Sequence, residues 1–214
     1  MTYHIITLFP AAFDSYLNES ILKRAIEDKK IKVKFYNPRD FTIGTSYADR
    51  RVDDKPYGGG PGMVIEALPV IKAIAKAKGK KNAKVIWFTP SGKQFDTKSA
   101  KNAAAKHKDI ILICGRYEGI DARVKKAFKV EEVSVGPYVL TGGELPAMIL
   151  IDSISRQIAG VLGDIQSLEE SRIASPDVYT RPEVLEYKGK KYRVPQVLLS
   201  GNHKLIDEWR RNKK

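Results

Sequence analysis

The chain has 214 residues, of which 38 are lysine or arginine and 25 are aspartate or glutamate, so its formal net charge is +13. Its 43% hydrophobic and 29% charged residues are typical of a folded globular protein and exclude an intrinsically disordered one. One cysteine (Cys114) and three widely separated histidines (His4, His107 and His203) exclude an intrachain disulfide and the usual zinc motifs, so no metal site is predicted.

Short apolar runs and helical patterns alternate along the first three-quarters of the chain. Runs rich in β-branched residues predict strands at 3–9, 31–36, 84–89, 109–114 and 130–135. Apolar residues at helical spacing predict helices at 13–25, 68–77, 97–107, 121–128 and 145–158. This alternation predicts an α/β fold with a mostly parallel sheet and helices on both faces.

The sequence indicates neither a targeting segment nor a membrane span. The start, MTYHIITLFP, has no basic n-region and too short an apolar run for a signal peptide. The longest apolar stretch, 145–162, is interrupted by Asp152 and Arg156, whereas a membrane span needs about 18 apolar residues. We therefore predict a cytoplasmic protein with no membrane partner.

The composition changes near residue 163. The polar stretch GDIQSLEESRIASPD is typical of a linker, and little periodicity follows it until a helix predicted near 203–211. We divide the chain into an α/β domain (1–162), a linker (163–178) and a small basic C-terminal domain (179–214).

Positive charge is concentrated in two segments. Residues 69–84 carry six lysines and no acid, and residues 179–214 carry ten lysines and arginines against four acids. Clusters of this kind attract phosphate backbones, which favours a nucleic-acid partner. A solvated, lysine-rich surface is the alternative.

Three glycine-rich loops are the strongest indication of a site. They read DDKPYGGGPGM (53–63), GRYEGID (115–121) and SVGPYVLTGGELP (134–146), and each contains carboxylates. The latter two follow predicted strands, where ligands of open α/β sheets bind. Dinucleotide, P-loop and serine-hydrolase motifs are absent from the sequence. Each loop alone is explained by a tight turn; together they predict a site. Cys114 ends a predicted strand nearby. It is either a buried core residue or a nucleophile.

Longer strings of the sequence resemble a known family. DDKPYGGGPGM, ICGRYEGIDARV, VGPYVLTGGELPAMILIDSISR, YTRPEVLEY and VLLSGNH occur in order, and the likeness extends from residue 1 to about residue 211. They resemble the bacterial tRNA (guanine-N1)-methyltransferases of the SPOUT class. The resemblance implies methyl transfer from S-adenosylmethionine to N1 of guanosine 37 of tRNA, a homodimer, and a trefoil-knotted cofactor-binding domain. Family members continue with further helices, so it also implies a small, shortened helical C-terminal domain that binds tRNA.

The resemblance implies a cofactor pocket built from three loops. Family members usually carry aspartate where this chain has Pro137, which has no amide hydrogen to donate. The implied cofactor-binding residues are Trp87, Phe88, Thr89, Pro90, Gly92, Gly115, Tyr117, Glu118, Ser134, Val135, Gly136, Pro137, Tyr138, Val139, Leu140, Gly142, Gly143 and Pro146. The family also suggests Mg²⁺, for which the sequence shows no ligand cluster.

The resemblance also implies catalytic residues. Removal of the N1 proton needs a general base, and a carboxylate is suited to the task. Glu170 occupies the place of the family's linker aspartate, with Glu169 as the alternative and Asp164 and Asp177 as weaker candidates. Arg156 matches the arginine that would stabilise negative charge developing on O6; a surface or interface ion pair is the alternative.

The tRNA-binding residues that the resemblance implies are Asp53, Tyr57, Gly58, Gly59, Gly60, Arg181 and His203. Glu118 is also suited to accept a hydrogen bond from a base edge. Two other functions stay open. One is a related SPOUT methyltransferase that acts on another RNA, for example on a ribose 2′-oxygen of ribosomal RNA. The other is a non-catalytic RNA-binding relative.

Overall fold

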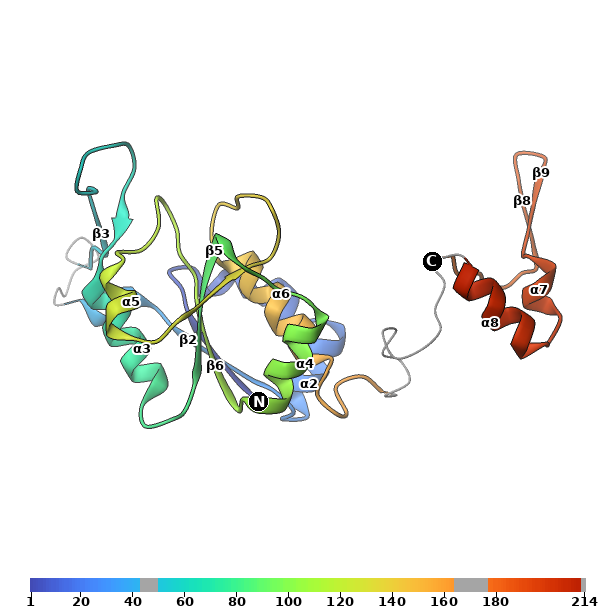
Figure 1. The fold of residues 1–214 in the computed structure, drawn as a ribbon, viewed down its shortest axis with the longest axis horizontal. Helices are drawn as coiled ribbons and strands as arrows, with labels where there is room; N and C mark the ends of the chain where they lie inside the picture. The colour runs from blue at the N-terminus through green and yellow to red at the C-terminus, as the bar shows by residue number, and fades with distance from the viewer. Residues whose placement is uncertain (43–49, 164–176, 213–214) are drawn as a thin grey trace. The chain divides into compact units, whose positions relative to one another are not determined.

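The structure is a computed structural model that describes residues 1–42, 50–163 and 177–212 (Figure 1). The chain divides into two compact units, Met1–Leu162 and Gly163–Lys214, and each is described by itself. The first unit contains, in chain order, β1 (Thr2–Ile6), η1 (Pro10–Phe13), α1 (Asp14–Leu17), α2 (Ser20–Glu27), β2 (Lys32–Tyr36), η2 (Pro38–Phe41), β3 (Asp53–Asp54), β4 (Val64–Ile65), α3 (Ala67–Lys78), β5 (Lys84–Gln94), α4 (Thr97–Lys106), β6 (Asp109–Ile113), α5 (Arg123–Ala127), β7 (Glu131–Ser134) and α6 (Glu144–Ser155).

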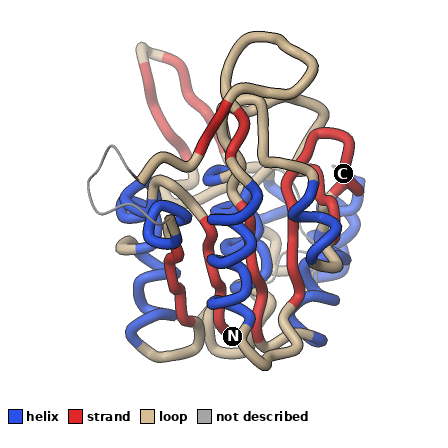
Figure 2. Tube along the Cα trace, turned by 90° about the vertical axis from the view of Figure 1, so that its left-hand side faces the viewer, coloured by secondary structure: helices blue, strands red, loops and turns tan. Residues whose placement is uncertain are grey.

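The centre of the first unit is a five-stranded sheet in the order β2-β1-β6-β5-β7. Every neighbouring pair in it is parallel, which confirms the predicted mostly parallel sheet. Parallel strands end at the same edge, so the loops that follow them gather at one end of the sheet, opposite the N-terminus (Figure 2).

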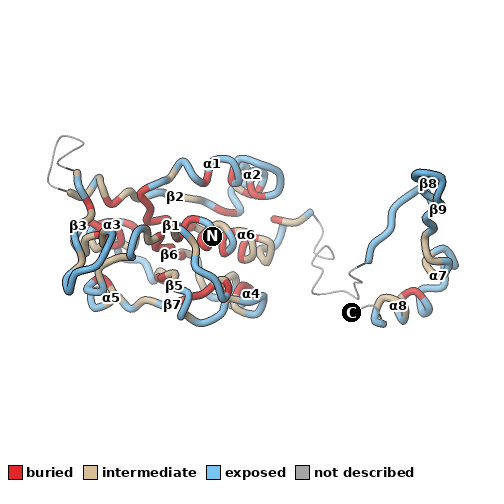
Figure 3. The backbone as a smooth tube through the Cα atoms, turned by 90° about the horizontal axis from the view of Figure 1, so that it is seen from above, coloured by how far each residue is buried: buried red, intermediate tan, exposed pale blue. Residues whose placement is uncertain are grey.

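Two hydrophobic clusters pack on opposite faces of this sheet, because side chains alternate along each strand. In β1, Tyr3 and Ile5 join the cluster formed with α1, α2, α4 and α6, whereas Ile6 joins the cluster formed with α3 and α5. Helices therefore cover both faces, as predicted. Figure 3 shows α3 and α5 on one side of the sheet and α4 and α6 on the other, with buried residues along the strands between them.

Strand β5 differs from its prediction, because it continues past residue 89 to Gln94. Both Phe88 and Lys93 pair with Val133 of β7, so the four residues between them leave the ladder and return to it. The predicted strand ended early because Pro90 and Gly92 are typical of a turn. In the structure these residues form a bulge within one strand.

The second unit contains β8 (Val184–Tyr187), β9 (Lys190–Arg193), α7 (Gln196–Leu199) and α8 (His203–Asn212). The helix predicted near 203–211 is confirmed as α8. The sequence analysis predicted only helical structure here, whereas the unit also contains the antiparallel hairpin of β8 and β9. Among the described residues, no helix is both long enough and apolar enough to cross a membrane.

Candidate active site

A cavity of about 240 Å³ opens between the bulge of β5 and the carboxyl ends of β6 and β7. Three chain segments form its walls: the bulge of β5 and the loops that follow β6 and β7. The lining residues are Phe88, Thr89, Pro90, Gly115, Arg116, Tyr117, Glu118, Gly119, Val133, Ser134, Val135, Gly136, Tyr138, Val139, Leu140, Thr141, Gly142, Gly143 and Pro146.

All the residues predicted to bind the cofactor line the cavity, except Trp87, Gly92 and Pro137. Trp87 is buried in the cluster beneath α3 and α5, where the Lys125 ammonium lies 5.0 Å from its ring centroid. A Cβ at Gly92 would lie 2.6 Å from the backbone nitrogen of Val133. The glycine therefore permits β5 to return to β7, a packing role that the motif did not distinguish from ligand binding.

The loop after β6 is held in place by backbone hydrogen bonds. The amide of Glu118 donates to the carbonyl of Met63 at 3.0 Å, and the amide of Ile65 donates to the carbonyl of Gly119 at 3.0 Å. Tyr117 adopts a left-handed φ of 59° at the turn. A Cβ on Gly62 would lie 2.7 Å from Glu118 Cγ. The glycine-rich segment 53–63 therefore packs directly against this wall.

The third wall, after β7, depends on two close approaches. A Cβ on Gly136 would collide with the ring of Tyr138, whose hydroxyl donates to the carbonyl of Val135 at 3.2 Å. A Cβ on Gly143 would lie 2.5 Å from Cys114 Cα. The Gly143 amide donates to the carbonyl of Gly115 at 2.9 Å, which joins the second and third walls.

A buried charge network joins the same two walls. Glu144, the first residue of α6, is 3% exposed; it accepts a hydrogen bond from Thr7 Oγ1 at 2.7 Å and lies 3.0 Å from Arg116 Nε. The Arg116–Glu144 contact lacks hydrogen-bond alignment, so its attraction is Coulombic. The guanidinium of Arg116 also stacks over the Phe9 ring, 4.8 Å from its centroid.

Sequence reasoning missed Arg116 as a wall residue. The signal available was its position directly after the strand-end glycine of GRYEGID, opposite a carboxylate already noted in GGELP. Thr7 carried no signal, because only the parallel pairing of β1 with β6 brings it near. Gly119, Val133 and Thr141 complete the additional lining residues.

Cys114 lies behind the cavity. It is buried, and burial together with the nearby Glu144 carboxylate raises the pKa of its thiol well above the ordinary value. A thiol that stays protonated is a poor nucleophile, which favours the core interpretation of this residue.

Arg156, the predicted catalytic arginine, does not line this cavity in its own chain. Arg156 is the half-buried C-cap of α6, at the opposite end of that 12-residue helix from Glu144. A helix of this length spans about 18 Å. Glu170, Glu169 and Asp164 lie outside the described residues.

The predicted substrate residues fall into two groups. Tyr57 is fully exposed in the first unit, and Gly58, Gly59 and Gly60 follow it with φ values of 87°, 81° and 115°. Asp53 is half-buried in β3. In the second unit, Arg181 is exposed, and His203 begins α8, whose amides at Lys204 and Leu205 donate to the Asn202 side chain.

Comparison with known proteins gives a consistent result. Residues 1–214 match the family model for tRNA (Guanine-1)-methyltransferase TrmD. A tRNA (guanine-N(1)-)-methyltransferase of Clostridioides difficile is 50% identical over 218 residues, 99% of this chain and 91% of that protein. One from Caldanaerobacter subterraneus is 48% identical and covers 100% and 86% of the two chains. The crystal structure of tRNA (m1G37) methyltransferase from Aquifex aeolicus superposes with a TM-score of 0.78 at 36% identity, over 98% of this chain and 87% of that one.

Proposed function

Because the chain belongs to the tRNA (guanine-1)-methyltransferase family TrmD, we propose that it transfers a methyl group from S-adenosylmethionine to N1 of guanosine 37 of tRNA. The observation that carries the proposal is the cavity between the bulge of β5 and the carboxyl ends of β6 and β7. Its walls consist of the loops in which the family resemblance places the cofactor.

The cavity suits a nucleoside with a charged tail. Phe88, Val139 and Leu140 offer apolar surface, and the loops 115–119 and 134–143 offer backbone amides and carbonyls close to the ligand space. When bound, S-adenosylmethionine would supply an electrophilic methyl group on sulfur. The chain's own residues would orient it and exclude water.

The proposed chemistry at the base requires two further groups. Glu170, or alternatively Glu169, would accept the N1 proton, and Arg156 would stabilise the negative charge on O6. Among the described residues there is no group of three or more His, Cys, Asp and Glu side chains that could hold Mg²⁺, and no step is assigned to that ion.

We also propose a homodimer. Arg156 lies about 18 Å along α6 from the cavity of its own chain, so a second copy would have to bring an arginine to that cavity. The exposed side of α6 is apolar, since Leu145 and Ile149 are one helical turn apart and both exposed. Burying such a patch stabilises an association between copies.

Three other properties of the family are proposals for this chain. A trefoil knot is supported by the return of segment 134–143 to Cys114 and Gly115 after β7. Residues 179–212, with their basic charge, would bind the tRNA, through Arg181 and His203 among others. A cytoplasmic location follows from the proposed substrate, because tRNA is made and used there in bacteria.

The test uses radiolabelled S-adenosylmethionine and unmodified tRNA transcripts with guanosine or adenosine at position 37. We expect label only on the guanosine transcript, located on N1 by nuclease digestion and chromatography. Label on a ribose 2′-oxygen would favour the related SPOUT activity. Cofactor binding by calorimetry without label on any transcript would contradict the proposal and favour a non-catalytic RNA-binding protein.

A further inference from the structure

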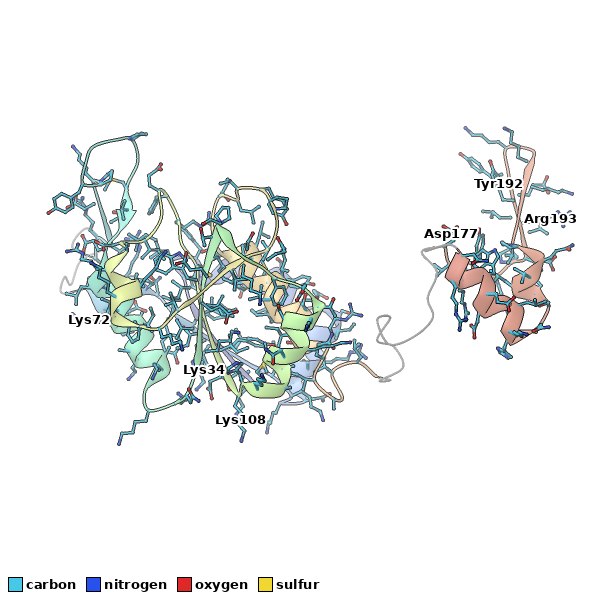
Figure 4. All side chains as sticks on the ribbon, viewed as in Figure 1. Lys34, Lys72, Lys108, Asp177, Tyr192 and Arg193 are labelled. Atoms are coloured by element: carbon cyan, nitrogen blue, oxygen red, sulfur yellow. The ribbon has the colours of Figure 1, made fainter. Side chains whose placement is uncertain are left out.

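The hairpin of β8 and β9 presents one distinct face. Its register pairs Leu185 with Tyr192 and Tyr187 with Lys190. Side chains alternate along a strand, so these four lie together on one side of the hairpin, and we call them the hairpin aromatic face. Figure 4 shows Tyr192 on β9, beside Arg193, which belongs to the opposite side.

The hairpin aromatic face is unusually exposed for its composition. Leu185, Tyr187 and Tyr192 are 58%, 59% and 52% exposed. A two-stranded hairpin gains little stability by itself, and apolar side chains gathered on one exposed face are typical of a binding surface. The two-residue turn at Lys188 and Gly189, with φ values of 52° and 71°, fixes the register and therefore the membership of this face.

The charge of the hairpin identifies the partner. Within residues 184–193 there are four cations (Lys188, Lys190, Lys191 and Arg193) and one acid (Glu186). The Lys188 ammonium lies 5.4 Å from the centroid of the Tyr187 ring, so positive charge adjoins an exposed π surface. An apolar protein surface would match the rings but leave the cations unpaired. A double-stranded RNA backbone would match the cations but leave the rings without contacts.

Unpaired nucleotides match both features, because bases stack on aromatic rings while phosphates pair with lysines. We propose that the hairpin aromatic face binds unpaired bases of the substrate tRNA by stacking on Tyr187 and Tyr192, with Lys188 and Lys190 contacting the adjoining phosphates. The inference rests on the proposed function and extends it, because it gives roles to residues of the hairpin to which the resemblance assigned none.

Paired variants of the full-length protein separate stacking from charge. Tyr187→Ile/Tyr192→Ile removes both rings and keeps residues that favour strands, whereas Tyr187→Phe/Tyr192→Phe keeps the rings and is the matched control. We expect the isoleucine pair to weaken binding of an unmodified tRNA transcript at least about fivefold, because each stacked base is worth that much or more. The slope of log affinity against log salt should not change. The phenylalanine pair should bind within about twofold of the wild type.

Lys188→Gln/Lys190→Gln should behave in the opposite way. Loss of two phosphate contacts lowers the magnitude of the salt slope by about 1 to 2. A single-stranded RNA oligonucleotide and a blunt duplex of equal length give a further comparison. The isoleucine pair should lose affinity for the single strand and retain its affinity for the duplex.

Three outcomes would overturn the inference. In the first, the isoleucine pair binds tRNA with wild-type affinity. In the second, it loses as much affinity for the duplex as for the single strand. In the third, its mass in sedimentation differs from that of the wild type while its RNA affinity is unchanged. The last would assign the face to a contact between copies. Failure of the proposed function is distinguishable, because it would appear as absent methyl transfer by the wild-type protein, whatever the hairpin variants do to RNA binding.

Discussion

Replacing Glu144 by glutamine tests the buried network that joins two walls of the cavity. The glutamine carbonyl can still accept from Thr7, but its amide group would face Arg116 Nε, which is also a donor. Breaking a buried ion pair from one side costs about 3–5 kcal/mol. The Arg116 side chain is 26% exposed, so water solvates part of the freed charge, and we expect about 2 kcal/mol.

For a unit of this size, that loss lowers the Tm by about 4–8 °C. The assay is thermal and urea unfolding in a Trp209→Phe background, where Trp87 is the only tryptophan and reports on the first unit. Since Arg116 also lines the cavity, affinity for S-adenosylmethionine should fall in parallel, measured by calorimetry.

Thr7→Val is the matched control for this prediction. It removes the hydrogen bond that Thr7 Oγ1 donates to Glu144 and the one that it accepts from the Phe9 amide, and it leaves the ion pair. We therefore expect a loss of about 1–2 kcal/mol and a smaller change in cofactor affinity. An unfolding free energy for Glu144→Gln within about 0.5 kcal/mol of the wild type would refute the reasoning, because a change that small is typical of a surface substitution.

Four further substitutions or reactions test the site. Gly143→Ala should abolish cofactor binding and lower the Tm, since its Cβ would meet backbone at Cys114 Cα; unchanged calorimetry would contradict the packing argument. Arg156→Ala should reduce the methyl-transfer rate by at least about 100-fold with cofactor affinity nearly unchanged, and equal losses in both would assign it a structural role. Glu170→Gln should abolish turnover in a folded protein; near-normal turnover would move the base to another acid. Because burial raises the pKa of Cys114, iodoacetamide at pH 8 should label the native protein far more slowly than the urea-unfolded one, and labelling at equal rates would show that the thiol is accessible.

Much of the first unit follows from local patterns in the sequence. β1 and β6 are apolar runs buried on both faces, and such runs identify strands of a covered parallel sheet. The walls after β6 and β7 were found because glycine-rich segments after strands have a specific physical use, whereas the wall from β5 was expected from the family resemblance alone. The contacts of Arg116 and Thr7 with Glu144 could not be predicted, because they depend on which strands are neighbours, and that order is not a local property.

The hairpin of the second unit was missed for a different reason. Its strands, VLEY and KKYR, are largely exposed on both faces and too short to show an alternation of apolar and polar residues. Lys188 and Gly189 do not form one of the familiar turn pairs with asparagine or aspartate, so the turn signal was weak as well. An exposed functional surface has little reason to carry the apolar pattern that sequence analysis detects.

The bulge of β5 makes the cavity sensitive to chain length. Residues 89–92 leave the ladder opposite Val133 and rejoin it at the same residue, so their number fixes the pairing of everything beyond them. Because the side-chain period of a strand is two, an added residue that shifts the pairing of Lys93 by one position would turn Gln94 to the other face of the sheet. Surface loops usually tolerate added residues. We expect the cavity to be more sensitive to the number of residues in this segment than to the identity of the side chains that it turns toward the cavity.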